Sequence, residues 1–245
     1  MVSDNPVITI DGPAASGKGT LAQRLSADLG FNLLDSGLLY RIVAYTATLE
    51  QLPLQDAVNL EAFIRDQLRF KINEEPSRDV SKGIYEAYIF KQVGVEDIVS
   101  INNRNVNLEL RSQETGVNSS VVSAIPEVRK LLIPVQRSMR TPPGLVADGR
   151  DMGTVVFPDA RIKFYLDASV EIRARRRLEQ LKKHSDASLI EDMMMEIKQR
   201  DERDRTRNVA PLVAANDAIT LDTTNMSINK VFSVARTTIR ELLGN

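Results

Sequence analysis

A glycine-rich stretch with a single lysine constrains the fold of this chain more than any other feature: Gly12-Pro13-Ala14-Ala15-Ser16-Gly17-Lys18-Gly19-Thr20. It follows an apolar run, Val7–Ile10, and precedes leucines at helical spacing, Leu21, Leu25 and Leu29. A strand, a glycine-rich loop and a helix in this order form a P-loop, in which backbone N–H groups and the helix N-terminus surround phosphate oxygens. We therefore predict a nucleotide-phosphate site here rather than an ordinary turn before a helix.

Two polar side chains of this loop have defined roles in the motif. Lys18 would reach the β- and γ-phosphates, and Thr20 supplies the hydroxyl expected near Mg²⁺. Gly19 stands where Ser or Thr usually follows the lysine, and this G-K-G-T variant resembles nucleoside monophosphate kinases. We predict that residues 12–20 bind ATP and that Lys18 is catalytic.

Composition excludes several classes of protein. The chain has no cysteine and one histidine, His184, which excludes disulfides, thiolate zinc sites, cysteine nucleophiles and histidine-rich metal sites. Its 245 residues suffice for one α/β domain, and a formal net charge of −1 argues against nucleic-acid or membrane partners. No apolar run is long enough for a bilayer and the polar N-terminus lacks a signal segment, so we expect a cytoplasmic protein.

Short apolar runs alternate with helical patterns, which predicts an α/β fold with a parallel sheet covered by helices. The predicted strands are Val7–Ile10, Phe31–Leu34, Leu145–Ala147, Ile162–Leu166 and Ile219–Leu221. Helices are expected after Gly37, from Pro126, after an N-cap at Ser169, after Ser188 and after an N-cap at Ser227.

Residues 70–110 break this alternation. Three fragments, Arg69–Ile72, Tyr88–Phe90 and Val106–Leu110, resemble short antiparallel strands joined by polar turns. We interpret residues 69–111 as an inserted subdomain of one domain whose core is 6–68 and 112–245. Residues 182–188 are polar and lie between two helices, which is the composition of a lid but also of a plain surface turn.

Two further loops follow predicted strands, where an open α/β sheet binds its ligands. In Asp35-Ser36-Gly37-Leu38-Leu39-Tyr40-Arg41, the serine and arginine suit a phosphate, although Asp35 or Ser36 could simply cap the next helix. In Ala147-Asp148-Gly149-Arg150-Asp151-Met152-Gly153-Thr154, Asp148 stands where P-loop proteins hold an acidic residue that orients the Mg²⁺ shell. Arg150 and Asp151 are expected to contact the ligand, the alternative being a surface salt bridge between them.

The stretch 200–207, Arg-Asp-Glu-Arg-Asp-Arg-Thr-Arg, has a charge pattern that a purely structural helix would avoid. Arg200–Asp204 and Asp201–Arg205 are favourable i,i+4 pairs, whereas Arg203 and Arg207 form a like-charge pair. An anionic ligand between the arginines would remove this conflict. A second basic cluster precedes it on another predicted helix, Arg173, Arg175, Arg176 and Arg177.

These residues suit phosphoryl transfer, in which catalysis is mostly positioning and electrostatic stabilisation. Arginine stays charged and binds phosphate through two parallel N–H bonds. An acceptor phosphate is already anionic near neutral pH, so no general base is required. That agrees with a chain that has almost no histidine.

The four motifs, in this order, resemble those of the bacterial cytidylate kinases, clearly over residues 6–45 and 112–225 and weakly over 70–110. The resemblance implies a P-loop three-layer fold with a five-stranded parallel sheet, an inserted monophosphate-binding subdomain and a helical lid around residues 173–188. It implies that a monomer in pyrimidine metabolism transfers the γ-phosphoryl group of ATP, with Mg²⁺, to CMP or dCMP.

The resemblance also assigns residues to roles. Ser36, Arg41, Arg150 and Arg207 would hold the acceptor phosphate, and Arg200 and Asp204 would contact the sugar. Ser120, Arg129 and Asp151 would read cytosine, whose exocyclic amine is a donor to a carboxylate. Arg173 and Arg177 would approach the ATP phosphates from the lid. The catalytic residues would be Lys18, Asp148, Arg150 and Arg207, with Thr20 at Mg²⁺ and Asp148 acting on it through water.

Two departures from the family pattern and three alternatives remain. Ala15 replaces a glycine of the family loop, although alanine tolerates positive φ poorly, and residues 92–110 are unfamiliar. The acceptor could instead be UMP or dTMP. A nucleotide-dependent switch is another reading, although the chain has no Asn-Lys-x-Asp or Thr-Lys-x-Asp sequence that would read guanine. The balanced charge disfavours nucleic-acid binding.

Overall fold

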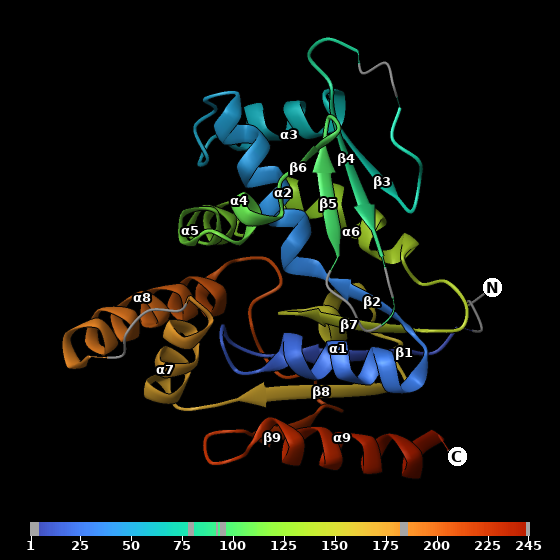
Figure 1. Cartoon of the computed structure of the whole chain (residues 1–245), viewed down its shortest axis with the longest axis vertical. Helices are drawn as coiled ribbons and strands as arrows, with labels where there is room; N and C mark the ends of the chain where they lie inside the picture. The colour runs from blue at the N-terminus through green and yellow to red at the C-terminus, as the bar shows by residue number, and fades with distance from the viewer. Residues whose placement is uncertain (1–4, 78–80, 92, 94–96, 182–185, 244–245) are drawn as a thin grey trace.

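The computed structural model describes residues 5–77, 81–91, 93, 97–181 and 186–243, which form a central sheet, a second smaller sheet and the helices around them (Figure 1). The central sheet has five strands in the order β2-β7-β1-β8-β9, and every pair is parallel. Its strands are β1 (Val7–Asp11), β2 (Asn32–Asp35), β7 (Leu145–Gly149), β8 (Ile162–Asp167) and β9 (Ile219–Asp222). All five predicted strands are therefore confirmed, together with the parallel sheet.

Helices cover both faces of this sheet because successive strand residues point to opposite sides. Val7 of β1 packs into one hydrophobic core, while Ile8 and Ile10 pack into another. The first core contains residues of α2 (Ser36–Leu49), α3 (Ala57–Asp66) and α6 (Pro126–Ser138). The second contains residues of α1 (Lys18–Leu29) and α9 (Ile228–Leu243). The result is the expected three-layer arrangement.

The second sheet, at the upper end of Figure 1, consists of β3 (Leu68–Ile72), β4 (Tyr85–Phe90), β5 (Ile98–Ile101) and β6 (Arg104–Asn105). The predicted strands over Arg69–Ile72 and Tyr88–Phe90 are confirmed as β3 and β4, but they pair in parallel, and the antiparallel pairs β4–β5 and β5–β6 involve strands that were not predicted. Parallel pairing needs a longer connection than a hairpin turn, and β3 ends at Ile72 whereas β4 begins only at Tyr85.

The predicted strand over Val106–Leu110 is also wrong, because these residues begin helix α4 (Asn107–Arg111). Val106 and Leu110 are both buried, four residues apart, whereas Leu108 between them is 85% exposed. That spacing fits one face of a helix and not a strand. The side chain of Asn107 fixes the turn by accepting from the Val99 N–H at 2.7 Å and donating to the Asp97 carbonyl at 2.9 Å.

Three more helices stand beside the cleft between the sheets. Helix α5 (Gln113–Val122) packs on α2, and α7 (Val170–Gln180) packs on α8 (Ala187–Thr206). Met193 and Ile197 of α8 are buried with Leu178 of α7 in one apolar cluster. Helix α8 begins just before Ser188, with Asp186 as its N-cap, and the central residues of the predicted lid segment, 182–185, lie outside the described residues.

Three predicted helix starts are confirmed, two of them by the hydrogen bond that a serine N-cap accepts. Pro126 is the first residue of α6, and the Ser169 and Ser227 hydroxyls accept N–H bonds from Ile172 and Lys230. Asp35 does cap α2, since its carboxylate accepts the Leu38 N–H at 3.2 Å. None of the helices in the described part of the chain is both long and apolar enough to cross a membrane.

Candidate active site

The P-loop joins β1 to α1, and its shape is imposed by close contact with β8. A Cβ atom at residue 12 would lie 2.0 Å from the Leu166 carbonyl oxygen, so only Gly12 fits, and its φ is 145°. Gly17, the N-cap of α1, has a φ of 96°. Ala15 also adopts the left-handed region, with a φ of 58°, which confirms the strain that its side chain predicts at this position.

Two arginines of α7 hold the carbonyl groups of this loop. Arg173 is 2% exposed and donates to the Ala14 carbonyl at 3.2 Å, while its ion pair with Asp201 of α8 measures 2.5 Å. Arg176 donates to the Ser16 carbonyl at 3.3 Å and to the Thr223 carbonyl at 2.7 Å. Arg173 thus connects the P-loop to α8. Asp201 pairs with Arg173 and not with Arg205, the i,i+4 partner expected from the sequence.

Lys18 and Asp148 face each other across the end of the P-loop. The Lys18 ammonium donates to the Pro13 carbonyl at 3.0 Å and lies 3.9 Å from a carboxylate oxygen of Asp148. Burial, followed by repulsion from Arg150, lowers the pKa of Lys18, and burial raises the pKa of Asp148. A nucleotide phosphate would therefore stabilise the charged form of Lys18, and a bound cation would stabilise the charged form of Asp148.

The donor set here fits Mg²⁺, which binds one or two protein oxygens and completes its shell with water and substrate phosphates. The side chains of Thr20 and Asp148 both line a cavity of about 450 Å³ beside the P-loop. A Cβ atom at residue 19 would lie 3.2 Å from an Asp148 oxygen, so Gly19 leaves this carboxylate uncovered. These oxygens could hold the ion at the phosphates.

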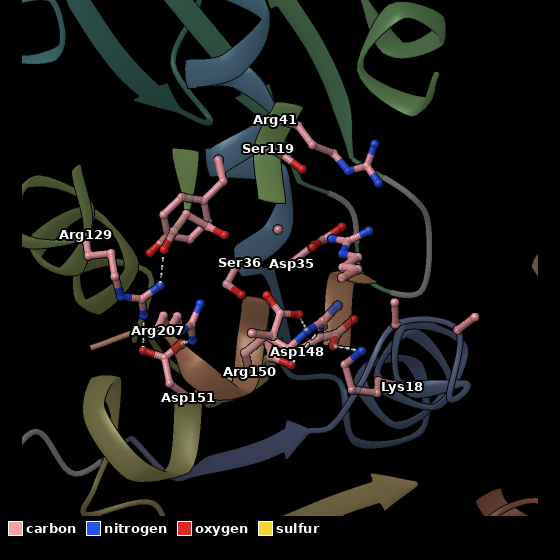
Figure 2. Close-up of a pocket in the computed structure, with 18 of the residues that line it drawn as sticks. Lys18, Asp35, Ser36, Arg41, Ser119, Arg129, Asp148, Arg150, Asp151 and Arg207 are labelled. Carbon is pink, nitrogen blue, oxygen red and sulfur yellow. Dashed lines mark hydrogen bonds and ion pairs between the residues drawn. The ribbon is translucent and has the colours of Figure 1, made fainter. Parts of the chain in front are cut away.

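A second cavity of about 190 Å³ lies between the P-loop, α2, the turn after β7, and α8, and Figure 2 shows its lining. Its charge differs sharply from the net charge of −1 of the whole chain. Four carboxylates line it, Asp35, Asp148, Asp151 and Asp204. They face seven cationic side chains, Lys18, Arg41, Arg129, Arg150, Arg177, Arg200 and Arg207. With three more positive than negative groups, this cavity favours an anionic ligand.

Arg150 and Asp151, which are neighbours in the sequence, form ion pairs with residues of two helices and not with each other. Arg150 forms an ion pair of 2.8 Å with Asp204 of α8, and Asp151 forms one with Arg129 of α6. The alternative of a surface salt bridge between Arg150 and Asp151 is therefore wrong. Figure 2 shows Arg129, Arg207 and Asp151 together at one end of the group and Lys18 at the other.

Several buried N–H donors of the arginines have no acceptor among the residues that the structure describes. They are Arg129 Nε, Arg200 Nε and Arg207 Nη2. Burial and repulsion from Arg150 lower the pKa of Arg200 to about 9, and burial and Arg129 lower the pKa of Arg207. Buried cations with unused N–H groups are costly in the free protein, and an anion in the cavity would offset this cost.

The remaining predicted residues are placed as follows. Ser36 and Arg41 line the 190 Å³ cavity, although Arg41 already donates to the Leu110 carbonyl at 2.7 Å. Ser120 does not line it, because its hydroxyl accepts from Arg203 at 3.3 Å. This bond also turns Arg203 toward α5, which is how the helix accommodates the like-charge pair with Arg207.

Sequence reasoning missed five residues that shape the site. Tyr40, Ser119 and Ser123 line the cavity, with the Tyr40 ring centroid 5.6 Å from the Arg129 guanidinium carbon. Arg176 supports the P-loop, and Asp11 binds the turn after β7. Tyr40 and Arg176 lay inside motifs that were already recognised. Asp11 had only one signal, its place at the end of a strand directly before Gly12.

A third cavity, of about 590 Å³, lies on the other side of the P-loop. Apolar and polar groups share its lining, which includes residues of the P-loop, α7 and the segment between β9 and α9, namely Ser16, Gly17, Arg176, Thr223, Met226, Ile228 and Val231. The P-loop therefore separates this larger, more apolar space from the small electropositive one.

Comparison with known proteins agrees with this arrangement. A family model described as "Cytidylate kinase" matches residues 8–241. A cytidylate kinase from Vibrio vulnificus (strain YJ016) is 44% identical over 96% of both chains, and one from Erwinia tasmaniensis is 42% identical over 99% of both chains. A crystal structure of TT1252 from Thermus thermophilus covers 96% of both chains, with a TM-score of 0.42 and 17% identity, which is too remote to bear on the fold.

Proposed function

The chain belongs to the cytidylate kinase family, and on this premise we propose that it transfers the γ-phosphoryl group of ATP to CMP or dCMP, giving ADP and CDP or dCDP. The observation that carries the proposal is the electropositive cavity directly beside the P-loop, with its unused arginine donors. A kinase needs two phosphate sites in contact, and here Lys18 of the P-loop lines the electropositive cavity itself, 3.9 Å from Asp148.

The donor site is the P-loop and the cavity behind it. Residues 12–20 bind the ATP phosphates, and the 590 Å³ cavity has room and apolar lining for the base. Thr20 and, through water, Asp148 would hold Mg²⁺, and the ion would neutralise charge on the ATP phosphates. Arg177, which lines the acceptor cavity, reaches the phosphates when the lid, residues 173–188, closes.

The acceptor site is the electropositive cavity. Ser36, Arg41, Arg150 and Arg207 bind the phosphate of CMP, and Arg200 and Asp204 bind its sugar. At the far end, Asp151 accepts from the exocyclic amine of cytosine, and Arg129 holds that carboxylate in place. Ser120, which accepts from Arg203, does not line this cavity, whereas Ser119 and Ser123 line it and their hydroxyl oxygens can still accept a hydrogen bond.

These residues act by positioning and by charge. The acceptor phosphate is an anion at neutral pH, so its oxygen attacks the γ-phosphorus of ATP without a general base. Lys18, Arg150 and Arg207 stabilise the negative charge that spreads over the transferred group. ADP is the leaving group, and its β-phosphate is held by the P-loop during the transfer. Because these groups are held before substrate binds, little reorganisation is needed during the reaction.

We further infer how the protein operates as a whole. It would be a monomer that acts on free nucleotides in the cytoplasm, and its net charge of −1 disfavours nucleic acid as a partner. Residues 69–111 would form the monophosphate-binding subdomain: α4 and β5 line the 450 Å³ cavity, which shares Asp35, Arg41 and Asp148 with the acceptor cavity. Light scattering of the purified protein tests the monomer, which a stable dimer would contradict.

An assay of ADP release tests the activity. The protein is mixed with ATP, Mg²⁺ and one acceptor at a time from CMP, dCMP, UMP, AMP, GMP and dTMP. We expect rapid turnover with CMP and dCMP, little with the others, and none after the metal is chelated. Faster turnover with UMP or dTMP would assign a different acceptor. Slow ATP hydrolysis that no monophosphate accelerates would instead indicate a switch.

A further inference from the structure

Asp11, at the end of β1, has a role that the reaction itself does not require. The side chain is buried, and each of its two carboxylate oxygens accepts a different backbone N–H. One oxygen accepts from Met152 and the other from Gly153, both at 2.8 Å. These two donors directly follow Arg150 and Asp151, the pair that faces the acceptor cavity.

The β1–β7 ladder explains why a side chain is needed at this point. The last paired residues of the two strands are Asp11 and Gly149. Beyond them the chain leaves the sheet and forms a single π-helical turn, η1 (Met152–Val156). The first N–H groups of any helical turn lack partners inside the turn, and Met152 and Gly153 are buried, so water does not serve them. The Asp11 carboxylate satisfies both.

This arrangement replaces a local cap by a distant one. The residue at the N-cap position of η1 is Asp151, and an aspartate there ordinarily accepts the first N–H groups of its own helix. Here the Asp151 side chain makes no such bond. Its carboxylate binds Arg129 instead and lies 3.7 Å from Arg207.

The turn also has little room in which to shift. A Cβ atom at residue 149 would lie 2.7 Å from the Ser36 hydroxyl and 2.7 Å from the Met152 side chain. The backbone thus passes tightly between α2 and η1, and Asp11 fixes the far end of the same turn. Because Asp11 is also the residue before Gly12, one side chain connects the start of the P-loop to the turn that carries Arg150 and Asp151.

We propose that Asp11 is a positioning residue for acceptor recognition: by capping η1 in place of Asp151, it leaves the Asp151 carboxylate free to face the acceptor cavity. The inference rests on the proposed assignment of Arg150 and Asp151 to CMP. Asp11 touches no substrate in this scheme. Its effect on the reaction passes through the position of the turn, and therefore through affinity and selectivity for the monophosphate.

Asp11→Asn tests this proposal with the smallest change in shape. The amide oxygen still accepts one N–H, but its NH₂ group opposes the other, so the turn loses one acceptor and Asp151 becomes its alternative cap. We expect KM for CMP to rise about 10-fold, the factor that corresponds to one hydrogen bond of about 1.4 kcal/mol. KM for ATP should change less than about 2-fold, and the ratio of kcat/KM for CMP to that for UMP should fall.

Two controls separate positioning from a general loss of stability. Ile239→Ala removes a buried side chain of α9, far from the acceptor cavity, and should lower Tm without changing KM for CMP or the CMP-to-UMP ratio. Asp28→Asn removes a surface ion pair with Arg236 and should leave both properties unchanged. If Asp11 has a merely structural role, Asp11→Asn should behave like Ile239→Ala, with a lower Tm but an unchanged KM for CMP.

The outcomes distinguish this inference from the assignment on which it rests. If Arg150→Ala and Asp151→Ala leave KM for CMP unchanged, the assignment of the acceptor site is wrong. If those variants lose CMP affinity but Asp11→Asn lowers only Tm, or raises KM for ATP and CMP equally, the role of Asp11 is overturned. Should Asp11→Asn not fold, Asp11→Ser retains one acceptor and is read by the same ratio. Failure of both variants to fold would make Asp11 structural and overturn the proposal.

Discussion

The donor and acceptor sides of the site are built in opposite ways. The proposed donor side is one continuous segment, residues 12–20, whose backbone would provide most of the contacts to ATP. Its Ala14 and Ser16 carbonyls accept from Arg173 and Arg176. The acceptor side consists of charged side chains from α2, α6, α8 and the turn after β7. Ion pairs between these elements, such as Arg150 with Asp204, hold the side chains in place.

This difference determines what each side tolerates. On the donor side, the constraints are steric, since a side chain at residue 12 would collide with β8. On the acceptor side, they are electrostatic, because cationic side chains outnumber the carboxylates that face them. We therefore expect substitutions on the donor side to act through catalysis or backbone strain, and substitutions on the acceptor side to act through affinity for the monophosphate.

Lys18→Ala should have the largest effect. Among the residues that the structure describes, its ammonium donates a hydrogen bond only to the Pro13 carbonyl, so the fold should survive its loss. A preorganised charge at the transferred group is worth about 10²–10³ in rate, and we expect kcat to fall by that factor. Steady-state kinetics and circular dichroism check both points, with Lys71→Ala on the surface as a control. Loss of cooperative unfolding in Lys18→Ala would show that the loop is misplaced.

Arg150→Ala should have the second largest effect, and this effect should be confined to the acceptor side. It removes a charge-assisted contact to the acceptor phosphate, and such bonds are worth about 1.5–3 kcal/mol, or roughly 10- to 100-fold. We expect KM for CMP to rise, or kcat to fall, by this factor while KM for ATP stays near its wild-type value. Initial-rate measurements with each substrate varied in turn would reveal it. Unchanged kinetics would remove Arg150 from the acceptor site.

Asp151→Ala should sharpen the comparison within the acceptor side, because it tests base recognition and not phosphate binding. A paired contact to a base edge provides about 1–3 kcal/mol of discrimination. The ratio of kcat/KM for CMP to that for UMP should therefore fall about 5-fold or more. The loss of the buried partner of Arg129 will also lower Tm, but that effect is common to both substrates. Equal losses with CMP and UMP would exclude Asp151 as the residue that reads the base.

Ala15→Gly should have the smallest effect and the opposite sign. Alanine at a φ of 58° costs about 1–2 kcal/mol, which exceeds the entropy that glycine adds to the unfolded chain. We expect the free energy of unfolding to increase by about 0.5–1 kcal/mol in urea titrations. The matched control, Ala62→Gly inside α3, should decrease it by about 1 kcal/mol. Destabilisation of similar size in both variants would contradict a strained loop.

The same contrast explains what could be predicted from the sequence. The P-loop and the five parallel strands were accessible because their signals are local: glycine spacing, apolar runs and helix caps. The partners of the acceptor side were not, because charge alone does not say that Arg150 pairs with Asp204 instead of Asp151. Residues 106–110 failed for another reason, since their alternating pattern matched a strand although Leu108 faces outward from a helix.

A crystal structure with CMP bound would test the central claim most directly, because it locates the monophosphate relative to the P-loop. The account predicts the CMP phosphate within hydrogen-bond distance of Arg150 and Arg207, and the cytosine amine against the Asp151 carboxylate. It would be contradicted by CMP bound on the other side of the P-loop, in the cavity lined by Thr223 and Met226, with the arginine cavity left without a phosphate.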